Sequence, residues 1–274
     1  MAPDLSRFFA ASGFAMAAVD YRLTTTATFP AQVEDLKTAI RWLRRIGPEH
    51  GIDVSRLGLW GASAGGHLAA LAALATAGLF EPPDAAYRDQ PSTVQAVAIG
   101  YAPIDFLQLD AYRAPAGTPS SDPETLELPP GMRSADPDSY ESLLMGAPIE
   151  TCPARVRRAN PVTFVRAGAP PFLILHGLSD TTIAEQQSEL FYDALAGCGN
   201  EVTLCLIEGL GHGFLNRTHL DDGPARRMTV RTRSRDGERI EHCVQPIFPM
   251  IEAFFRRHLA TDRRTNPQPV SIGR

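Results

Sequence analysis

The sequence predicts an α/β fold, in which a mostly parallel sheet carries helices on both faces. Short apolar runs alternate with stretches of helical periodicity, and this alternation is typical of parallel strands joined by crossover helices. The chain has 274 residues, of which 44% are hydrophobic and 21% charged, as in ordinary globular proteins. We therefore expect residues 1–274 to form a single domain rather than a disordered or fibrous chain.

Five apolar runs are the expected strands of this sheet. They are Phe14–Val19, Arg56–Trp60, Val94–Tyr101, Phe172–His176 and Val202–Ile207. Their apolar residues occupy consecutive positions, as in strands that are covered on both faces. Functional groups in such sheets lie on the loops that follow the carboxyl ends of the strands.

Four helices are expected between and after the strands. The first begins at Pro30, repeats apolar residues at helical spacing, and stops at Gly47-Pro48. The other three are Ala64–Ala77, Ala184–Ala196 with Gly197 as its stop, and Pro246–Leu259.

Two segments interrupt the alternation. Residues 107–160 include a proline-rich stretch, which disfavours continuous helix or strand and predicts a lid-like excursion. We expect this lid to bury its apolar residues, which are Tyr140, Leu143, Leu144 and Met145. Residues 229–244 have the pattern of a β-hairpin with an Asp-Gly turn, which could pack beside a site or mediate contacts in a homodimer.

Composition excludes several classes of function. A formal net charge of −5 argues against nucleic acid as a partner, because phosphate binding needs a basic surface. No apolar run reaches the ~18–20 residues of a membrane span, and no export signal is visible, which predicts a cytoplasmic protein. The four cysteines have no C-x-x-C pair and no metal-type spacing, so we expect reduced thiols, no metal and no cofactor.

A G-x-S-x-G motif, Gly61-Ala62-Ser63-Ala64-Gly65, lies between an expected strand and an expected helix. A sharp strand-to-helix turn would strain Ser63 and lift its hydroxyl above the sheet. Glycines are expected at 61 and 65 because side chains there would collide across the turn. The N–H of Ala64, at the start of the helix, could then stabilise an oxyanion as Ser63 attacks a carbonyl.

A serine nucleophile needs a base, and His212 is the expected one among seven histidines. It follows the strand Val202–Ile207 on a glycine-rich loop, whose spacing does not match a nucleotide-binding loop. His176 is expected to shape the loop that carries the acid, and His67 to pack or be solvated on the helix after Ser63. The remaining histidines are assigned no role: His50, His219, His242 and His258.

The base needs a carboxylate to hold its tautomer, and Asp180 is the preferred candidate. It lies 212 − 180 = 32 residues before His212, which is one helix plus one strand. Adjacent parallel strands would bring both loops to the same edge of the sheet. The order Ser63, Asp180, His212 is that of the α/β-hydrolases. Asp105, after the third strand, is the alternative acid.

Several segments together resemble a known family. They are Val19-Asp20-Tyr21-Arg22-Leu23, Phe29-Pro30-Ala31-Gln32-Val33-Glu34-Asp35, GIDVSRLGLWGASAGGHLAAL, PPFLILHGLSD and GLGHGF. The sequence resembles the alpha/beta hydrolase fold-3 and hormone-sensitive-lipase-like esterases, above all the bacterial feruloyl-esterase-like (BD-FAE) group. The resemblance covers roughly residues 4–213 and the last helix. It implies a serine carboxylesterase with Ser63 as nucleophile, Asp180 as acid and His212 as base, and Asp20-Tyr21-Arg22 as structural support.

The sequence departs from this family in its oxyanion segment. The H-G-G-G or H-G-G-x-W segment of these families should lie shortly upstream of Ser6, and it is absent here. We therefore expect a sheet without the first strands of the fold, an oxyanion hole that keeps only the Ala64 donor, and a full form that begins upstream of Met1.

The expected activity is hydrolysis of small to medium carboxylic esters through an acyl-enzyme on Ser63. Two alternatives remain, an arylformamidase or amidase on the same fold and an impaired hydrolase that acts as a binding protein. A prolyl-oligopeptidase-like peptidase fits less well, because that group usually has Tyr where Ala64 stands. The expected pocket residues are Phe106, Leu178, Ile183 and Phe214, and the expected partners are a small-molecule ester and a second copy of the chain.

Overall fold

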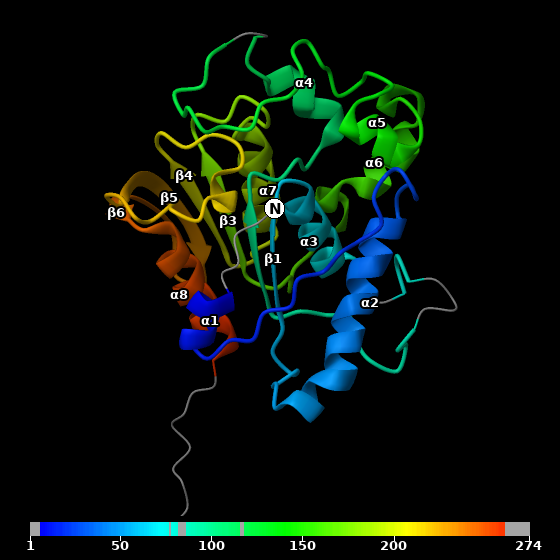
Figure 1. Cartoon of the computed structure of the whole chain (residues 1–274), viewed down its shortest axis with the longest axis vertical. Helices are drawn as coiled ribbons and strands as arrows, with labels where there is room; N and C mark the ends of the chain where they lie inside the picture. Colours follow the sequence, from blue (N-terminus) through cyan, green and yellow to red (C-terminus); the bar gives the residue numbers. More distant parts are fainter. Residues whose placement is uncertain (1–5, 77, 82–85, 116–117, 261–274) are drawn as a thin grey trace, which may run out of the picture.

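The computed structural model describes residues 6–76, 78–81, 86–115 and 118–260 (Figure 1). Within them, one six-stranded sheet runs in the order β1-β2-β3-β4-β5-β6. The first four strands are parallel: β1 (Gly58–Ala62), β2 (Ala96–Gly100), β3 (Phe172–Gly177) and β4 (Val202–Ile207). The last two, β5 (Arg226–Ser234) and β6 (Gly237–Gln245), are antiparallel. The mostly parallel sheet predicted from the sequence is confirmed.

Helices cover both faces of the sheet, as expected. One face packs on α2 (Ala31–Ile46), α3 (Ala64–Leu74) and α7 (Gln186–Gly197), and the other on α1 (Ser6–Ala11) and α8 (Ile247–Leu259). The strands alternate between the two cores, because successive side chains of a strand point to opposite faces. In β2, for example, Ala96 and Ala98 join the α8 core, whereas Val97 and Ile99 join the α2–α3–α7 core.

The expected strand at residues 14–19 is wrong. These residues form no ladder, and Met16 is 45% exposed. A strand needs a hydrogen-bonding neighbour, and β1 pairs only with β2 among the described residues. An apolar run without such a neighbour has nothing to satisfy its backbone groups except water, so it stays irregular.

Other elements match the predictions within a few residues at their ends. The helix expected over 64–77 ends at Leu74, where Ala75 turns extended, and residue 77 lies outside the described residues. The helix expected over 184–196 is α7, and the expected strands at 56–60 and 94–101 are β1 and β2. None of the helices in the described part of the chain has the length and apolar character that a bilayer crossing requires.

The excursion at 107–160 contains short helices only, in agreement with its proline content. They are α4 (Leu109–Tyr112), α5 (Tyr140–Met145) and α6 (Pro153–Ala159), and they lie together beyond one end of the sheet (Figure 1). Of the four apolar residues expected to be buried, Met145 is buried and Leu144 partly so, whereas Tyr140 and Leu143 are 62% and 44% exposed. The short helix α5 can turn only one side inward, which explains the difference.

The hairpin is longer than the predicted 229–244 and extends the sheet. Its two-residue turn, Arg235-Asp236, joins the paired residues Ser234 and Gly237. The hairpin packs on α7, where the Arg231 guanidinium lies 4.4 Å from the centre of the Tyr192 ring. β6 is the outer strand of the sheet, and its part in a homodimer stays a prediction.

A buried ionic cluster ties α2 to the loop after α3. Lys37 and Arg41 of α2 both contact the carboxylate of Glu81, and the three side chains are at most 6% exposed. Glu81 also accepts hydrogen bonds from the Ser92 hydroxyl at 2.6 Å and the Gly78 N–H at 2.9 Å. Burial raises the pKa of Glu81, but these donors and Lys37 outweigh burial and lower it to about 2. No sequence pattern predicted this cluster, because its residues are brought together only by the fold.

We expect Glu81→Gln to lower the free energy of unfolding by about 3 kcal/mol at neutral pH, because it leaves two buried cations without a counter-charge. A lowered carboxyl pKa stabilises the fold above the unfolded value, here 4.5, and this contribution is lost as the pH falls through about 2. The difference in unfolding free energy between the wild type and the variant should therefore shrink as the pH is lowered from 4.5 to about 2. Denaturant unfolding at several pH values measures it.

Asp89→Asn is the matched control, since it removes an ion pair with Arg45 that is 62% exposed on both sides. We expect a change below about 0.5 kcal/mol for this surface pair. Equal losses of stability in the two variants would contradict a structural role specific to the Glu81 cluster.

Candidate active site

Ser63 lies at the sharp turn between β1 and α3. Its backbone has φ 52° and ψ −124°, a strained conformation for a residue other than glycine. The turn is tight, because a Cβ added to Gly61 would lie 2.2 Å from the Gly65 carbonyl oxygen. The Ser63 N–H donates to the Gly100 carbonyl at 2.9 Å, which ties the turn to the end of β2. Strain stored at one serine is a feature of functional sites.

Of the two glycines that flank Ser63, Gly61 meets the expectation of crowding and Gly65 does not. Crowding is present at Gly61, as predicted, but a Cβ at Gly65 would meet no atom within 4 Å. The crowded position on the helix is instead Gly66, where a Cβ would lie 3.0 Å from the Ala102 Cβ. The reason is the direction of the helix, which turns residue 66 toward β2 and residue 65 away from the protein.

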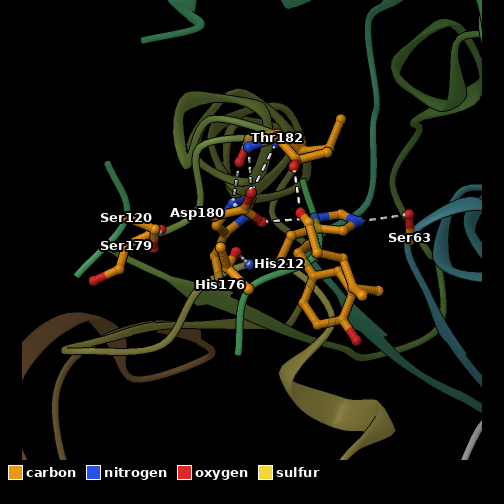
Figure 2. A network of polar contacts seen from close by, with 12 residues as sticks. Ser63, Ser120, His176, Ser179, Asp180, Thr182 and His212 are labelled. Atoms are coloured by element: carbon orange, nitrogen blue, oxygen red, sulfur yellow. Dashed lines mark hydrogen bonds and ion pairs between the residues drawn. The ribbon is translucent and has the colours of Figure 1, made fainter. Parts of the chain in front are cut away.

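His212 lies between Ser63 and Asp180 (Figure 2). Its Nε2 is 2.9 Å from the Ser63 Oγ, and its Nδ1 is 2.8 Å from the Asp180 Oδ2. The Asp180 side chain is fully buried, and its Oδ1 accepts hydrogen bonds from the N–H groups of Thr182 and Ile183 at 2.9 Å each. One carboxylate oxygen is thus held by the backbone, and the other is left to orient the imidazole.

The sheet topology brings the two loops together. Strands β3 and β4 are parallel neighbours in which Gly177 pairs with Ile207, and α7 connects them. The loop of Asp180 packs directly on the loop of His212, since the Ser179 N–H donates to the Leu210 carbonyl at 2.9 Å. A Cβ at Gly177 would lie 2.1 Å from the same oxygen, so the approach requires glycine.

His176 lies beneath the loop that carries Asp180. Burial lowers the pKa of His176, so the ring is neutral and has one donor and one acceptor nitrogen. Nε2 donates to the Ile183 carbonyl at 2.9 Å, and Nδ1 accepts from the Ser188 hydroxyl at 2.7 Å. These bonds fix the turn at residues 180–183, from which two N–H groups hold the Asp180 carboxylate.

The alternative acid, Asp105, has a different environment. Its carboxylate accepts from the Leu107 N–H at 3.1 Å and from the Gln108 amide at 2.6 Å, at the start of a short 3-10 helix. His67, on α3, is buried and stacks on Phe106 with ring centres 4.8 Å apart. Burial lowers the pKa of His67 to about 4, so this ring is neutral. Neither residue is hydrogen-bonded to His212.

The four residues expected to line one pocket are not brought together. Phe106 and Ile183 are buried in the core under the excursion, and Phe214 is buried in the α8 core, on the opposite face of the sheet. Leu178 is 44% exposed. Two cavities of about 250 and 260 Å³ border other residues, and neither is lined by Ser63, Asp180 or His212. Hydrophobicity alone does not say to which core a loop residue turns, and the role of these four residues in substrate binding stays a prediction.

Ala64 is the first residue of α3 and follows Ser63 directly, so its N–H has no acceptor within the helix. No group of three or more acidic, histidine or cysteine side chains in the described residues is arranged to hold a metal ion. The site consists of the Ser63 hydroxyl, the His212 imidazole and the Asp180 carboxylate in one hydrogen-bonded chain, at the start of α3.

His212 has two contacts that the sequence patterns did not predict. Tyr101, at the end of β2, packs edge-on against the imidazole with ring centres 4.7 Å apart, and its hydroxyl accepts from the Leu215 N–H at 3.2 Å. Burial raises the pKa of this phenol, which stays neutral. The other contact is the excursion, whose residues 120–126 touch the loop of His212. The position of Tyr101 at a strand end is a signal that could have found it.

Comparison with known proteins agrees with the geometry. LipM of Mycobacterium tuberculosis, a probable carboxylic ester hydrolase, is 31% identical over 195 residues, which are 71% of this chain and 40% of LipM. A truncated carbohydrate esterase from gut microbiota has 27% identity and a TM-score of 0.60, covering 75% of this chain and 70% of that one. Esterase 2 of the planctomycete Thermogutta terrifontis has 28% identity and a TM-score of 0.57, covering 78% and 67%.

The chain thus spans less than half the length of LipM. The BD-FAE family model matches residues 1–195, which include the turn of Ser63 and the loop of Asp180. With a parallel sheet, a strained serine after β1 and esterases as its structural neighbours, the chain belongs to the BD-FAE family of α/β-hydrolase esterases.

Proposed function

We propose that this protein is a serine carboxylesterase that hydrolyses small to medium esters through an acyl-enzyme on Ser63. The observation that carries the proposal is the continuous hydrogen-bonded chain from Asp180 through His212 to the strained Ser63. Each role matches its surroundings, since the serine is raised at a turn, the imidazole touches both partners, and the carboxylate is buried and held by backbone N–H groups.

In the proposed mechanism, the Ser63 Oγ attacks the ester carbonyl while the His212 Nε2 takes its proton. The resulting imidazolium is stabilised by the Asp180 carboxylate. His212 then gives the proton to the departing alcohol oxygen, and the carbonyl reforms as an acyl-enzyme. Water attacks this acyl group with His212 again as base, and the acid is released as Ser63 regains its proton.

The tetrahedral intermediates carry a negative oxygen that needs donors. Among the described residues, the N–H of Ala64 is the donor that the start of α3 presents next to Ser63. Its hydrogen bond would be stronger toward the oxyanion than toward the neutral carbonyl, which lowers the barrier.

The triad does not by itself distinguish an ester from an amide, so an arylformamidase or amidase remains the alternative. Turnover of p-nitrophenyl esters of increasing acyl length, compared with aryl formamides, separates the two. We expect ester turnover, because LipM, LipC and LipQ, which match 71%, 77% and 68% of this chain, are named as ester hydrolases or esterases. Arylacetamide deacetylase of Bos taurus, which favours the amidase alternative, matches 36% of the chain.

We expect Ser63→Ala to abolish ester turnover and labelling by a fluorophosphonate, because Ser63 supplies the hydroxyl that is hydrogen-bonded to the His212 Nε2. Mass spectrometry of the wild type should place the label on the peptide that contains Ser63. Labelling that persists in the variant would show that another residue is the nucleophile. Absence of labelling in a folded wild type would contradict the acyl-enzyme and favour a binding protein.

We expect Asp180→Asn to lower kcat by about 10³–10⁴, because an amide in this place favours the wrong imidazole tautomer. Asp105→Asn is the matched control and should stay within about threefold of the wild type, since its carboxylate only starts a short helix. Steady-state kinetics of both variants decide between the two carboxylates, and a larger loss in Asp105→Asn would reverse the assignment.

A further inference from the structure

The backbone around His212 is held by the excursion, through residues 120–126, which we call the clasp. The Gly211 N–H donates to the Asp122 Oδ2 at 2.6 Å, and the His212 N–H donates to the Thr125 Oγ1 at 2.8 Å. The His212 carbonyl accepts from the Leu126 N–H at 2.9 Å. Three backbone groups of the base and its neighbour are thus bonded to a segment some 90 residues earlier in the chain.

The clasp also holds the loop of the acid, as Figure 2 shows for Ser120 and Thr182. The Ser120 hydroxyl donates to the Ser179 carbonyl at 2.6 Å, and the Thr182 hydroxyl donates to the Leu126 carbonyl at 2.6 Å. The clasp therefore bridges the two loops that carry Asp180 and His212.

Close approach explains the glycines on either side of His212. A Cβ at Gly211 would lie 2.3 Å from the Thr125 Oγ1, and a Cβ at Gly213 would lie 2.6 Å from a methyl carbon of Leu126. Gly213 also has φ 85°, which disfavours other residues. Glycine at these positions lets the clasp lie directly on the backbone.

Asp122 is the charged anchor of the clasp. It is 4% exposed and forms an ion pair at 2.6 Å with Arg217, which follows His212 on the same loop. Burial raises the pKa of Asp122, but Arg217 and the N–H groups of Gly211 and Glu124 outweigh it and lower the pKa below 3.8. The carboxylate therefore stays ionised at neutral and mildly acidic pH, and the clasp does not loosen there.

We propose that Asp122 and Thr125 are positioning residues, which hold the His212 backbone so that its imidazole stays in line with Ser63 and Asp180. The inference rests on the proposed function for its effect on turnover. The position of an imidazole follows its Cα, and a displacement of about 1 Å in a reacting group can cost about 100-fold in rate. The excursion thus acts as part of the catalytic frame, and a chain with an undocked excursion has a misplaced base.

The sharpest test compares Thr125→Val with Thr125→Ser. Valine keeps the shape but removes the acceptor of the His212 N–H, whereas serine keeps that acceptor. We expect Thr125→Val to lower kcat by about 10- to 100-fold with KM changed by less than about threefold, and Thr125→Ser to stay close to the wild type. Asp122→Asn should show the same fall in kcat.

Asp110→Asn is the control for general damage to the excursion. Asp110 also forms an ion pair within the excursion, with Arg113 at 3.0 Å, and accepts from the Ser134 N–H, but it makes no contact with the loop of His212. We expect its kcat to stay within about twofold of the wild type. An equal fall in Asp110→Asn would show that any loosening of the excursion is harmful, and would overturn the proposal.

Hydrogen exchange supplies a readout that does not depend on activity. The amides of Gly211 and His212 should exchange faster in Asp122→Asn and Thr125→Val than in the wild type and Asp110→Asn. Unchanged exchange, or a rise in KM without a fall in kcat, overturns the positioning role. If the folded wild type neither turns over esters nor reacts with the fluorophosphonate, the proposed function fails. If the wild type is active and Thr125→Val has the same kcat, only the positioning role of the clasp is refuted.

Discussion

The imidazole of His212 depends on two short hydrogen bonds, one to Asp180 and one to Ser63, and the structure around them serves to keep both formed. Hydrogen bonds weaken steeply with distance and angle, so three loops from different strands must agree in position to within a fraction of an ångström. Strain at Ser63, the backbone donors to Asp180 and the bonds of His176 each remove freedom from one of these side chains.

The parallel sheet supplies the coarse part of this agreement. Neighbouring parallel strands deliver their carboxyl ends to one edge, which places the loops after β1, β3 and β4 together. The fine part comes from contacts between loops, in which Gly177 admits the Leu210 carbonyl and Gly211 admits the Thr125 side chain at distances that a Cβ would forbid. The fold thus uses the sheet for placement and glycine for close approach.

Buried carboxylates also fix the relative position of distant segments. The buried carboxylates of Glu81 and Asp122 each have a cationic partner and backbone N–H donors, which compensate the loss of water. Glu81 joins α2 to the loop after α3, and Asp122 joins the excursion to the loop of His212. Both connect segments far apart in the sequence, where hydrophobic contacts alone would leave the relative position less well defined.

The amino-acid order was enough for β1 to β4, for the helices α2, α3, α7 and α8, for the hairpin and for the residues of the proposed triad. Local patterns such as the apolar runs, the glycines around Ser63 and the 32-residue spacing of Asp180 and His212 act over short distances or through general rules of strand connection, so they can be read without coordinates. The irregular path of residues 14–19, the burial of Phe214 away from Phe106, and the contacts of Tyr101, Asp122 and Thr125 could not be read in this way. A strand forms only where a neighbour accepts its hydrogen bonds, and a proline-rich loop has no period that says which surface it will meet. These features were decided by tertiary packing, because they depend on which distant groups meet in space.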